Sequence, residues 1–175
     1  MFTIRRYAEG DHAAVRALFI AVNRALAPPD LREAFEGYIT RSLKEEIDRL
    51  ADYYAGKQSA FFVAYGGETL AGIFGLEGLG TPAAELRRMY VDPAFRRHGL
   101  ARRMLDHAEA TCRTAATPLL TLSTSELQQA ALAFYRTAGY ALVREETAAA
   151  QTNKTVGGDI RRYYFEKNLV QARMQ

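Results

Sequence analysis

Two stretches in the first third of the chain carry apolar residues at the three- and four-residue spacing of an amphipathic helix. The first follows Asp11, a candidate N-cap, and ends before Pro28 and Pro29. The second begins at the capping-box-like pair Asp30 and Glu33 and is the longer of the two. Their apolar faces comprise Val15, Leu18, Phe19 and Val22 in the first, and Phe35, Ile39, Leu43, Ile47, Leu50 and Tyr54 in the second. Core packing explains both faces, so neither helix requires a functional explanation.

The same spacing predicts two helices in the second half of the chain. One runs from Gly99 to about Arg113, and the other begins near a second capping-box pair, Ser125 and Gln128, and ends at Gly139. Their inward faces comprise Leu100, Met104, Leu105, Ala108 and Cys112 in the first, and Leu127, Ala131 and Phe134 in the second.

Apolar runs between these helices predict strands. Two of them, 59–65 and 69–77, flank a Gly66-Gly67 turn and predict an antiparallel β-hairpin. The strand–helix–strand unit around Gly99 predicts a parallel pair with a right-handed crossover. The other strands are Thr3–Tyr7, Glu85–Val91, Pro118–Leu122, Tyr140–Arg144 and Arg161–Glu166. The resulting order, β-α-α-β-β-β-α-β-α-β-β, predicts an α/β (α+β) fold in which helices cover both faces of a mixed sheet.

Length and composition are those of one compact domain over residues 1–175, with ordinary apolar and charged fractions. A net charge of +3 suits one local anion site but falls short of the basic surface of a dedicated nucleic-acid binder. The N-terminus has no apolar signal core and no apolar run could span a bilayer, so we expect a cytoplasmic protein without membrane contact. The single cysteine, Cys112, excludes an intrachain disulfide and offers no metal cluster, so no metal is expected.

The stretch Phe95–Met104, FRRHGLARRM, gathers four arginines and a histidine around Gly99, at the start of a predicted helix. A helix N-terminus is already partly positive, so this extra positive charge predicts a nearby anion. Unpaired backbone N–H groups, a glycine that allows close approach and charge-assisted bonds from arginine together predict a pyrophosphate cradle. Neither GxxxxGK[ST] nor GxGxxG occurs, which argues against a P-loop NTPase and a Rossmann enzyme.

Two motifs resemble the GNAT superfamily of acetyl-CoA-dependent N-acetyltransferases. Arg96-x-x-Gly99-x-Ala101, after a strand that ends in MYV and is followed by Asp-Pro, is similar to the family's Arg/Gln-x-x-Gly-x-Gly/Ala loop. Downstream, QQAALAFYRTAGY (128–140) is similar to the family's Asn-x-x-Ala-x-x-Leu-Tyr-x-x-x-Gly-Phe, with Gln128 in place of the usual asparagine. The element order also matches. The resemblance implies a mostly antiparallel seven-stranded sheet and acetyl transfer to a primary amine through a ternary complex.

The resemblance implies how this chain would hold acetyl-CoA. The loop at Gly99 would bind the pyrophosphate, while the strand end would pair with the pantetheine amides in the manner of an added strand. The implied cofactor-binding residues are Met89, Tyr90, Val91, Arg96, Arg97, His98, Gly99, Leu100, Ala101, Arg102, Gln128, Ala131 and Phe134.

Acetyl transfer needs a base for the ammonium proton and an acid for the departing thiolate. Tyr135 matches the family's tyrosine and is the candidate acid, the alternative being a packing role. Glu85 is the candidate base, as in some family members, although others use a chain of waters. Strand alternation places Glu85 on one face with Arg87, and Arg88 on the other. Charges in such a strand are costly unless paired or lining a cleft, so a purely structural ion pair of Glu85 with Arg87 or Arg161 is an equal alternative.

The sequence leaves the acceptor unidentified: a small molecule, an amino acid or a peptide. Arg87 and Arg88, together with Arg161 and Arg162, are candidates to bind an acceptor carboxylate, or else serve ion pairs of the sheet. The resemblance implies that the acceptor cleft is built by the first two helices, their connecting loop (27–30) and the polar stretch 147–159.

Other readings of the sequence remain open. A non-catalytic acyl-CoA sensor is the alternative function, and a nucleic-acid-binding domain lacks the stacking aromatics it would need among the arginines. A homodimer is left open by the resemblance.

Overall fold

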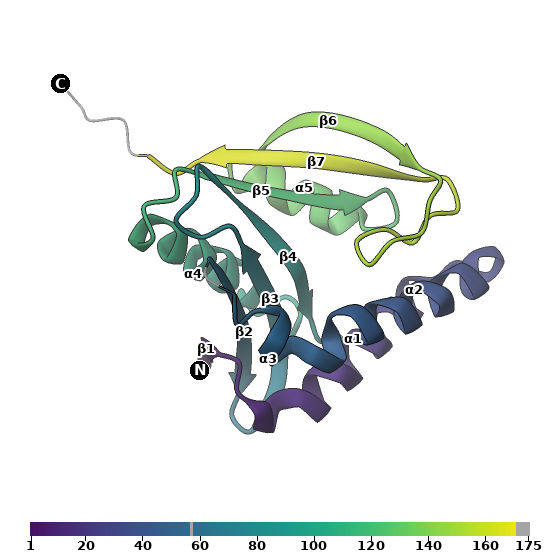
Figure 1. The fold of residues 1–175 in the computed structure, drawn as a ribbon, viewed down its shortest axis with the longest axis horizontal. Helices are drawn as coiled ribbons and strands as arrows, with labels where there is room; N and C mark the ends of the chain where they lie inside the picture. Colours follow the sequence, from purple (N-terminus) through teal and green to yellow (C-terminus); the bar gives the residue numbers. More distant parts are fainter. Residues whose placement is uncertain (57, 171–175) are drawn as a thin grey trace.

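A computed structural model describes residues 1–56 and 58–170. The elements are β1 (Phe2–Arg6), α1 (His12–Leu26), α2 (Arg32–Glu45), α3 (Leu50–Tyr53), β2 (Ser59–Gly66), β3 (Thr69–Glu77), β4 (Ala83–Val91), α4 (Leu100–Thr114), β5 (Leu119–Ser125), α5 (Gln129–Thr137), β6 (Ala141–Ala148) and β7 (Ile160–Asn168) (Figure 1). The predicted single domain over residues 1–175 includes residues 57 and 171–175, which lie outside the described residues.

The strands form one seven-stranded sheet in the order β1-β2-β3-β4-β5-β7-β6. Only β4 and β5 pair in parallel, through the crossover helix α4, and the other neighbours are antiparallel. The last strand in the described chain, β7, inserts between β5 and β6. The mixed, mostly antiparallel seven-stranded sheet that the sequence predicts is therefore confirmed.

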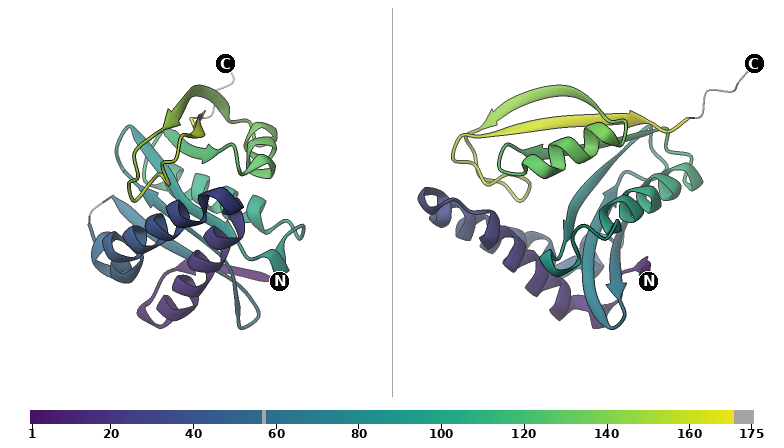
Figure 2. Two further views of the ribbon diagram at one scale, coloured as in Figure 1. Left: turned by 90° about the vertical axis from the view of Figure 1, so that its right-hand side faces the viewer. Right: turned by 180° about the vertical axis from the view of Figure 1, so that it is seen from behind.

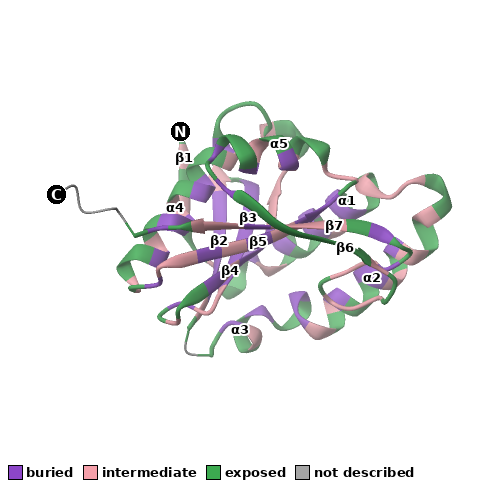
Figure 3. Ribbon diagram, turned by 90° about the horizontal axis from the view of Figure 1, so that it is seen from above, coloured by how far each residue is buried: buried purple, intermediate pink, exposed green. Residues whose placement is uncertain are grey.

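Helices cover both faces of the sheet, as predicted (Figure 2). Each face has its own hydrophobic core. Alternate residues of β2 supply the two cores: Phe62 packs with α4 and Leu105, whereas Val63 packs with Phe19 of α1. Burial on both sides explains why β2 and β3 read as continuous apolar runs rather than alternating ones. Edge strand β6 lacks such burial and is exposed along nearly its whole length (Figure 3).

The predicted second helix is interrupted. The structure ends α2 at Glu45, and Glu46 takes a non-helical backbone conformation (φ −139°) before a short 3₁₀ turn and α3. The side chain of Glu46 is fully buried beneath the sheet, where it meets Arg87 and Arg88. A continuous helix to Tyr54 was therefore the wrong prediction, because the buried ion pairs of Glu46 accompany a break in the helix.

Three predicted helix caps are also wrong. The N-cap of α2 is Leu31, without a side-chain cap bond, so Asp30 and Glu33 form no capping box. The carboxylate of Asp11 makes no cap bond to α1; it accepts hydrogen bonds from Arg5, from Tyr65 and from the backbone N–H of Ala8. Ser125 belongs to β5 rather than to a capping box, and α5 begins one residue after Gln128. Gly139 does end α5 as predicted, with φ +88°.

Candidate active site

The sheet opens between β4 and β5. These strands pair only from Ala83 to Leu86 on β4, opposite Leu119 to Leu122 on β5, and then diverge (Figure 1). On its other side, β4 remains paired with β3 up to Val91. The backbone of Met89–Val91 therefore has no strand partner on the side that faces β5, so an extended ligand could pair there as an added strand does.

A β-bulge at Arg88 changes which way the side chains of β4 point. Arg88 has φ +55°, and the register with β3 shifts between Ile73 and Gly75. Arg87 and Arg88 consequently both reach Glu46 on the α1–α3 side. Met89 instead packs into the core on the α4–α5 side. The simple alternation predicted for this strand, with Arg87 and Arg88 on opposite faces, is therefore wrong from Arg88 onward.

The loop before α4 has the geometry of an anion cradle. Gly99 caps the helix with φ +75°, and Arg97 is also left-handed, with φ +63°. Within the described residues, no hydrogen bond uses the backbone N–H groups of residues 97–102. The first helical bond runs from the N–H of Arg103 to Gly99. A Cβ on Gly99 would meet no atom within 4 Å, so the loop is open on that side of Gly99.

Charged side chains surround this cradle. Arg96 and Arg97 are exposed, and Arg102 forms a surface ion pair with Asp106 at 2.9 Å. The Nδ1 of His98 lies 2.7 Å from the backbone oxygen of Arg96, which folds the loop back on itself. The helix N-terminus, the free N–H groups and the arginines thus fit a pyrophosphate.

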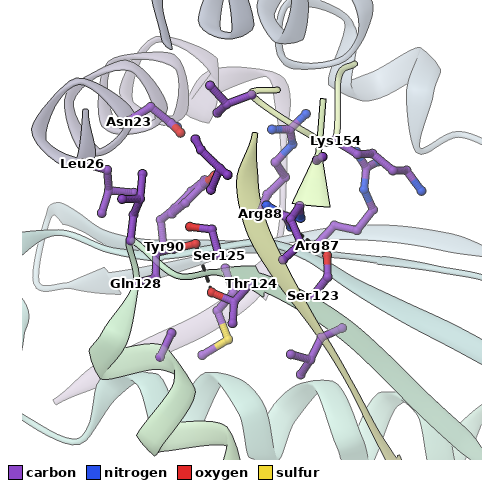
Figure 4. Close-up of a pocket in the computed structure, with 18 of the residues that line it drawn as sticks. Asn23, Leu26, Arg87, Arg88, Tyr90, Ser123, Thr124, Ser125, Gln128 and Lys154 are labelled. Carbon is purple, nitrogen blue, oxygen red and sulfur yellow. Dashed lines mark hydrogen bonds between the residues drawn. The ribbon is translucent and has the colours of Figure 1, made fainter. Parts of the chain in front are cut away.

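A pocket lies where β4 and β5 separate, and it brings together most of the predicted catalytic and acceptor residues. Figure 4 shows Arg87, Arg88 and Lys154 at one end of it and Asn23 and Leu26 at the other. Of the sequence-predicted site residues, the lining contains Glu85, Arg87, Arg88, Met89, Tyr90, Gln128, Ala131 and Tyr135. Val91 and Phe134 lie outside the lining, and both pack against the α4–α5 core.

Tyr135 is almost completely buried on α5, and its hydroxyl faces a sulfur atom. The hydroxyl lies 3.6 Å from Sδ of Met89, a weak acceptor. Burial, with a smaller contribution from Tyr90, raises the pKa of Tyr135 well above that of an ordinary phenol. The phenol therefore stays protonated at neutral pH, as a group that must give a proton should be.

Glu85 lies on the pocket wall beside a lysine from the β6–β7 loop. Nζ of Lys154 is 2.8 Å from its carboxylate and 3.8 Å from that of Glu77. The ion pair of Glu85 is therefore with Lys154, not with Arg87 or Arg161 as the structural alternative supposed. An ammonium group next to Glu85 occupies the kind of position that an acceptor ammonium would need.

Arg87 and Arg88 share the carboxylate of Glu46. Glu46 accepts hydrogen bonds from Arg87 at 2.9 Å and from Arg88 at 2.7 and 3.2 Å. Arg87 also pairs with Glu77, and Arg88 donates to the backbone oxygen of Asn153. These contacts favour the structural explanation for the two arginines, and their predicted role in acceptor binding stays a prediction.

The sequence analysis missed Glu46, which pairs with two arginines of the pocket, and the pocket residues Asn23 and Lys154. Glu46 follows Lys44 and Glu45 in a charged run, so nothing in the sequence marks it as buried. Asn23 follows the apolar Val22 of α1 and is equally buried, with its amide donating to Phe19. Lys154 lies in an irregular loop with no pattern to mark it.

His107 and Cys112 both take part in core packing. The ring of His107 packs edge-on against Phe62 and Phe74. Cys112 is fully buried, and burial raises the pKa of its thiol to about 11. Over residues 1–56 and 58–170, no cluster of histidine, cysteine or acidic residues could hold a metal ion. Over the same residues, no helix is long and apolar enough to cross a membrane.

The sequence matches the profile of the Acetyltransferase (GNAT) family over residues 28–140. The chain therefore belongs to the GNAT family and is an acetyltransferase. No curated protein matches it in sequence.

Solved structures share its fold at low sequence identity. A PaiA N-acetyltransferase from Thermoplasma acidophilum in complex with coenzyme A is 17% identical with a TM-score of 0.73, covering 96% of this chain and 99% of that one. The ribosomal-protein-S18-alanine N-acetyltransferase from Escherichia coli is also 17% identical, with a TM-score of 0.71 and coverage of 100% and 99%. An acetyltransferase of the GNAT family from Staphylococcus aureus Mu50 is 20% identical, with a TM-score of 0.71 and coverage of 97% and 100%.

Proposed function

We propose that this acetyltransferase transfers an acetyl group from acetyl-CoA to a primary amine of a small molecule, amino acid or peptide, by direct attack in a ternary complex. The observation that carries the proposal is the presence, in one structure, of an open anion cradle at Gly99 and of a pocket lined by Tyr135 and by β4, the strand that precedes the cradle in the chain. Bound acetyl-CoA would supply an activated thioester.

The coenzyme-binding role rests on two groups of backbone atoms. The free N–H groups of residues 97–102 would bind the pyrophosphate, supported by the side chains of Arg96 and Arg97. The unpaired edge of Met89–Val91 would pair with the pantetheine amides. The side chain of Gln128 is already bonded to Thr124 at 3.0 Å, so a contact to pantetheine would use its amide nitrogen.

Two side chains would carry the proton transfers. Glu85, once an acceptor ammonium replaces Lys154, would accept a proton from it directly or through water. Tyr135 would donate its proton toward the departing sulfur, a role favoured by its raised pKa and by the soft acceptor it already faces.

The first experiment measures thermal unfolding with acetyl-CoA, CoA and ATP. Acetyl-CoA and CoA should stabilise the protein, and ATP should do so less. Gly99→Glu should abolish the effect, because it adds a negative charge and a side chain at φ +75°. Gly10→Glu is the matched control, since Gly10 also has open space around its Cβ position but lies outside the cradle. No stabilisation by saturating acetyl-CoA would refute the proposal.

The second experiment separates an enzyme from the alternative, a non-catalytic acyl-CoA sensor. Thiol release is followed across a broad panel of amines. Tyr135→Phe should lower kcat about 100-fold while leaving the stabilisation by acetyl-CoA intact. Tyr163→Phe removes a hydroxyl outside the pocket lining and should change kcat little. Binding of acetyl-CoA without thiol release from any amine would favour the sensor.

A further inference from the structure

Four cationic side chains line the pocket, and three of them already have acidic partners. Arg87 and Arg88 share Glu46, and Lys154 pairs with Glu85. The fourth, Arg162 on β7, has no carboxylate within ion-pair distance among residues 1–56 and 58–170. Arg162 therefore supplies the pocket's one uncompensated charge from the part of the chain that the structure describes.

The guanidinium of Arg162 is held in place by one hydrogen bond, but another of its donors has no acceptor. Its Nη2 donates to Oγ of Ser123 on β5 at 2.8 Å. Its Nε is shielded from solvent and has no acceptor in the described structure. Glu146 lies across from Arg162 in the strand register, yet its carboxylate is bonded to Tyr164 and to Arg144. A buried donor without an acceptor is costly, so an incoming acceptor group would be favourable here.

The neighbouring arginine shows that this placement is particular to Arg162. Arg161 precedes it on β7, so its side chain points to the opposite face of the sheet. It is exposed, and its guanidinium lies 3.7 Å from Glu145. Of the two β7 arginines that the sequence offered as acceptor-binding candidates, only Arg162 lines the pocket.

The same pocket also offers a negative group. Glu85 lies opposite Thr121 on β5, and Arg162 reaches Ser123, two residues further along that strand. Two strand residues correspond to about 7 Å along the sheet. The pocket therefore contains both a carboxylate that could bind an ammonium and a guanidinium that could bind an anion.

We propose that the acceptor is a small primary amine that also carries a carboxylate, and that Arg162 binds that carboxylate. This inference rests on the proposed function and names its substrate class. The single free charge of Arg162 matches a single carboxylate, which its planar fork can bind through two hydrogen bonds. The ammonium of the acceptor would take the place of Lys154 beside Glu85.

The test compares amines in matched pairs that differ only in the carboxylate, using thiol release. The pairs are glycine with methylamine, β-alanine with ethylamine, 4-aminobutyrate with propylamine, and phenylalanine with phenethylamine. The wild-type protein should give the higher kcat/KM with the carboxylate-bearing member of at least one pair. Arg162→Gln should lower that value by about 10- to 100-fold, the effect of losing charge-assisted bonds, and leave the carboxylate-free member within about threefold.

Arg161→Gln is the matched control, because it removes the adjacent guanidinium from the opposite face, and it should resemble the wild type. Unchanged stabilisation of Arg162→Gln by acetyl-CoA shows that the variant is folded and binds the coenzyme. Equal or better turnover of the carboxylate-free members would overturn this inference and leave the proposed function standing. An equal effect of the two substitutions would overturn it as well. No thiol release from any amine would refute the proposed function, and the inference with it.

Discussion

Replacing Glu46 with glutamine should destabilise the protein strongly, although the two side chains have nearly the same shape. The carboxylate of Glu46 is completely buried and accepts four hydrogen bonds, from Tyr54, Arg87 and Arg88. An amide has one accepting oxygen and no charge, so the two guanidinium groups would keep only Glu77 as an acidic partner. Breaking a buried ion pair from one side costs about 3–5 kcal/mol. For a chain of this size, that corresponds to a fall in Tm of about 6–20 °C.

Urea unfolding followed by circular dichroism measures this loss, and Glu45→Gln provides the control. Glu45 is the preceding residue, but its partner is Arg41 in an exposed pair on α2, worth less than about 1 kcal/mol. A loss in Glu46→Gln no larger than in Glu45→Gln would refute the reasoning.

The stability lost in Glu46→Gln should also depend on pH. Burial alone would raise the pKa of Glu46, but the charges of Arg88 and Arg87 outweigh it and lower the pKa. A lowered folded-state pKa contributes stability that is fully present above the unfolded value of about 4.3 and is lost as pH falls through the folded value. The difference in unfolding free energy between the wild type and Glu46→Gln should therefore be constant near pH 7 and shrink below about pH 4. A difference that grows on acidification would contradict this assignment.

Three further predictions follow from single contacts. Hydrogen bonding from Arg5, opposed by burial, lowers the pKa of Asp11 to about 2. Asp11→Asn should therefore lower the free energy of unfolding by about 1–2 kcal/mol at pH 7. In urea unfolding, this difference from the wild type should fade between about pH 4 and pH 2. Lys154→Met should lower the KM for the acceptor severalfold in the thiol-release assay, because it removes the ammonium that competes for Glu85. A raised KM would contradict that competition. The thiol of Cys112 is buried, and its pKa is raised to about 11. It should therefore react with a disulfide reagent at pH 8 only after the protein unfolds. Rapid reaction of the native protein would show that the thiol is not shielded in the core.

The sequence predicted the fold well because periodic burial determines it. The helix stripes and the two-sided strands gave the correct element order and a seven-stranded sheet. The Gly99 loop was also readable, because a glycine with flanking arginines at a helix start has a direct physical meaning. The structure gives Gly99 a left-handed conformation and leaves the neighbouring backbone N–H groups free, and pyrophosphate binding there stays a prediction.

Features that depend on contacts between distant segments were not readable. The bulge at Arg88 leaves no trace in the order of residues, so the alternation predicted for β4 failed there. The turn at Glu46 was hidden because the apolar spacing continues through it into α3. Asp11 is a good cap by composition, yet Arg5 and Tyr65 draw its carboxylate away from the helix. Lys154 reaches Glu85 from 69 residues away, so only the folded chain brings them together.

The position of β7 between β5 and β6 has a consequence for the order of events during protein synthesis. In the described structure β6 pairs with β7 and with no other strand, so it emerges from the ribosome without a partner. A nascent chain that has reached only residue 159 already contains the Gly99 loop and Tyr135, but it lacks the strand that carries Arg162. Such a chain can therefore form the Gly99 loop and the β4 wall of the pocket before the wall that β7 supplies is present.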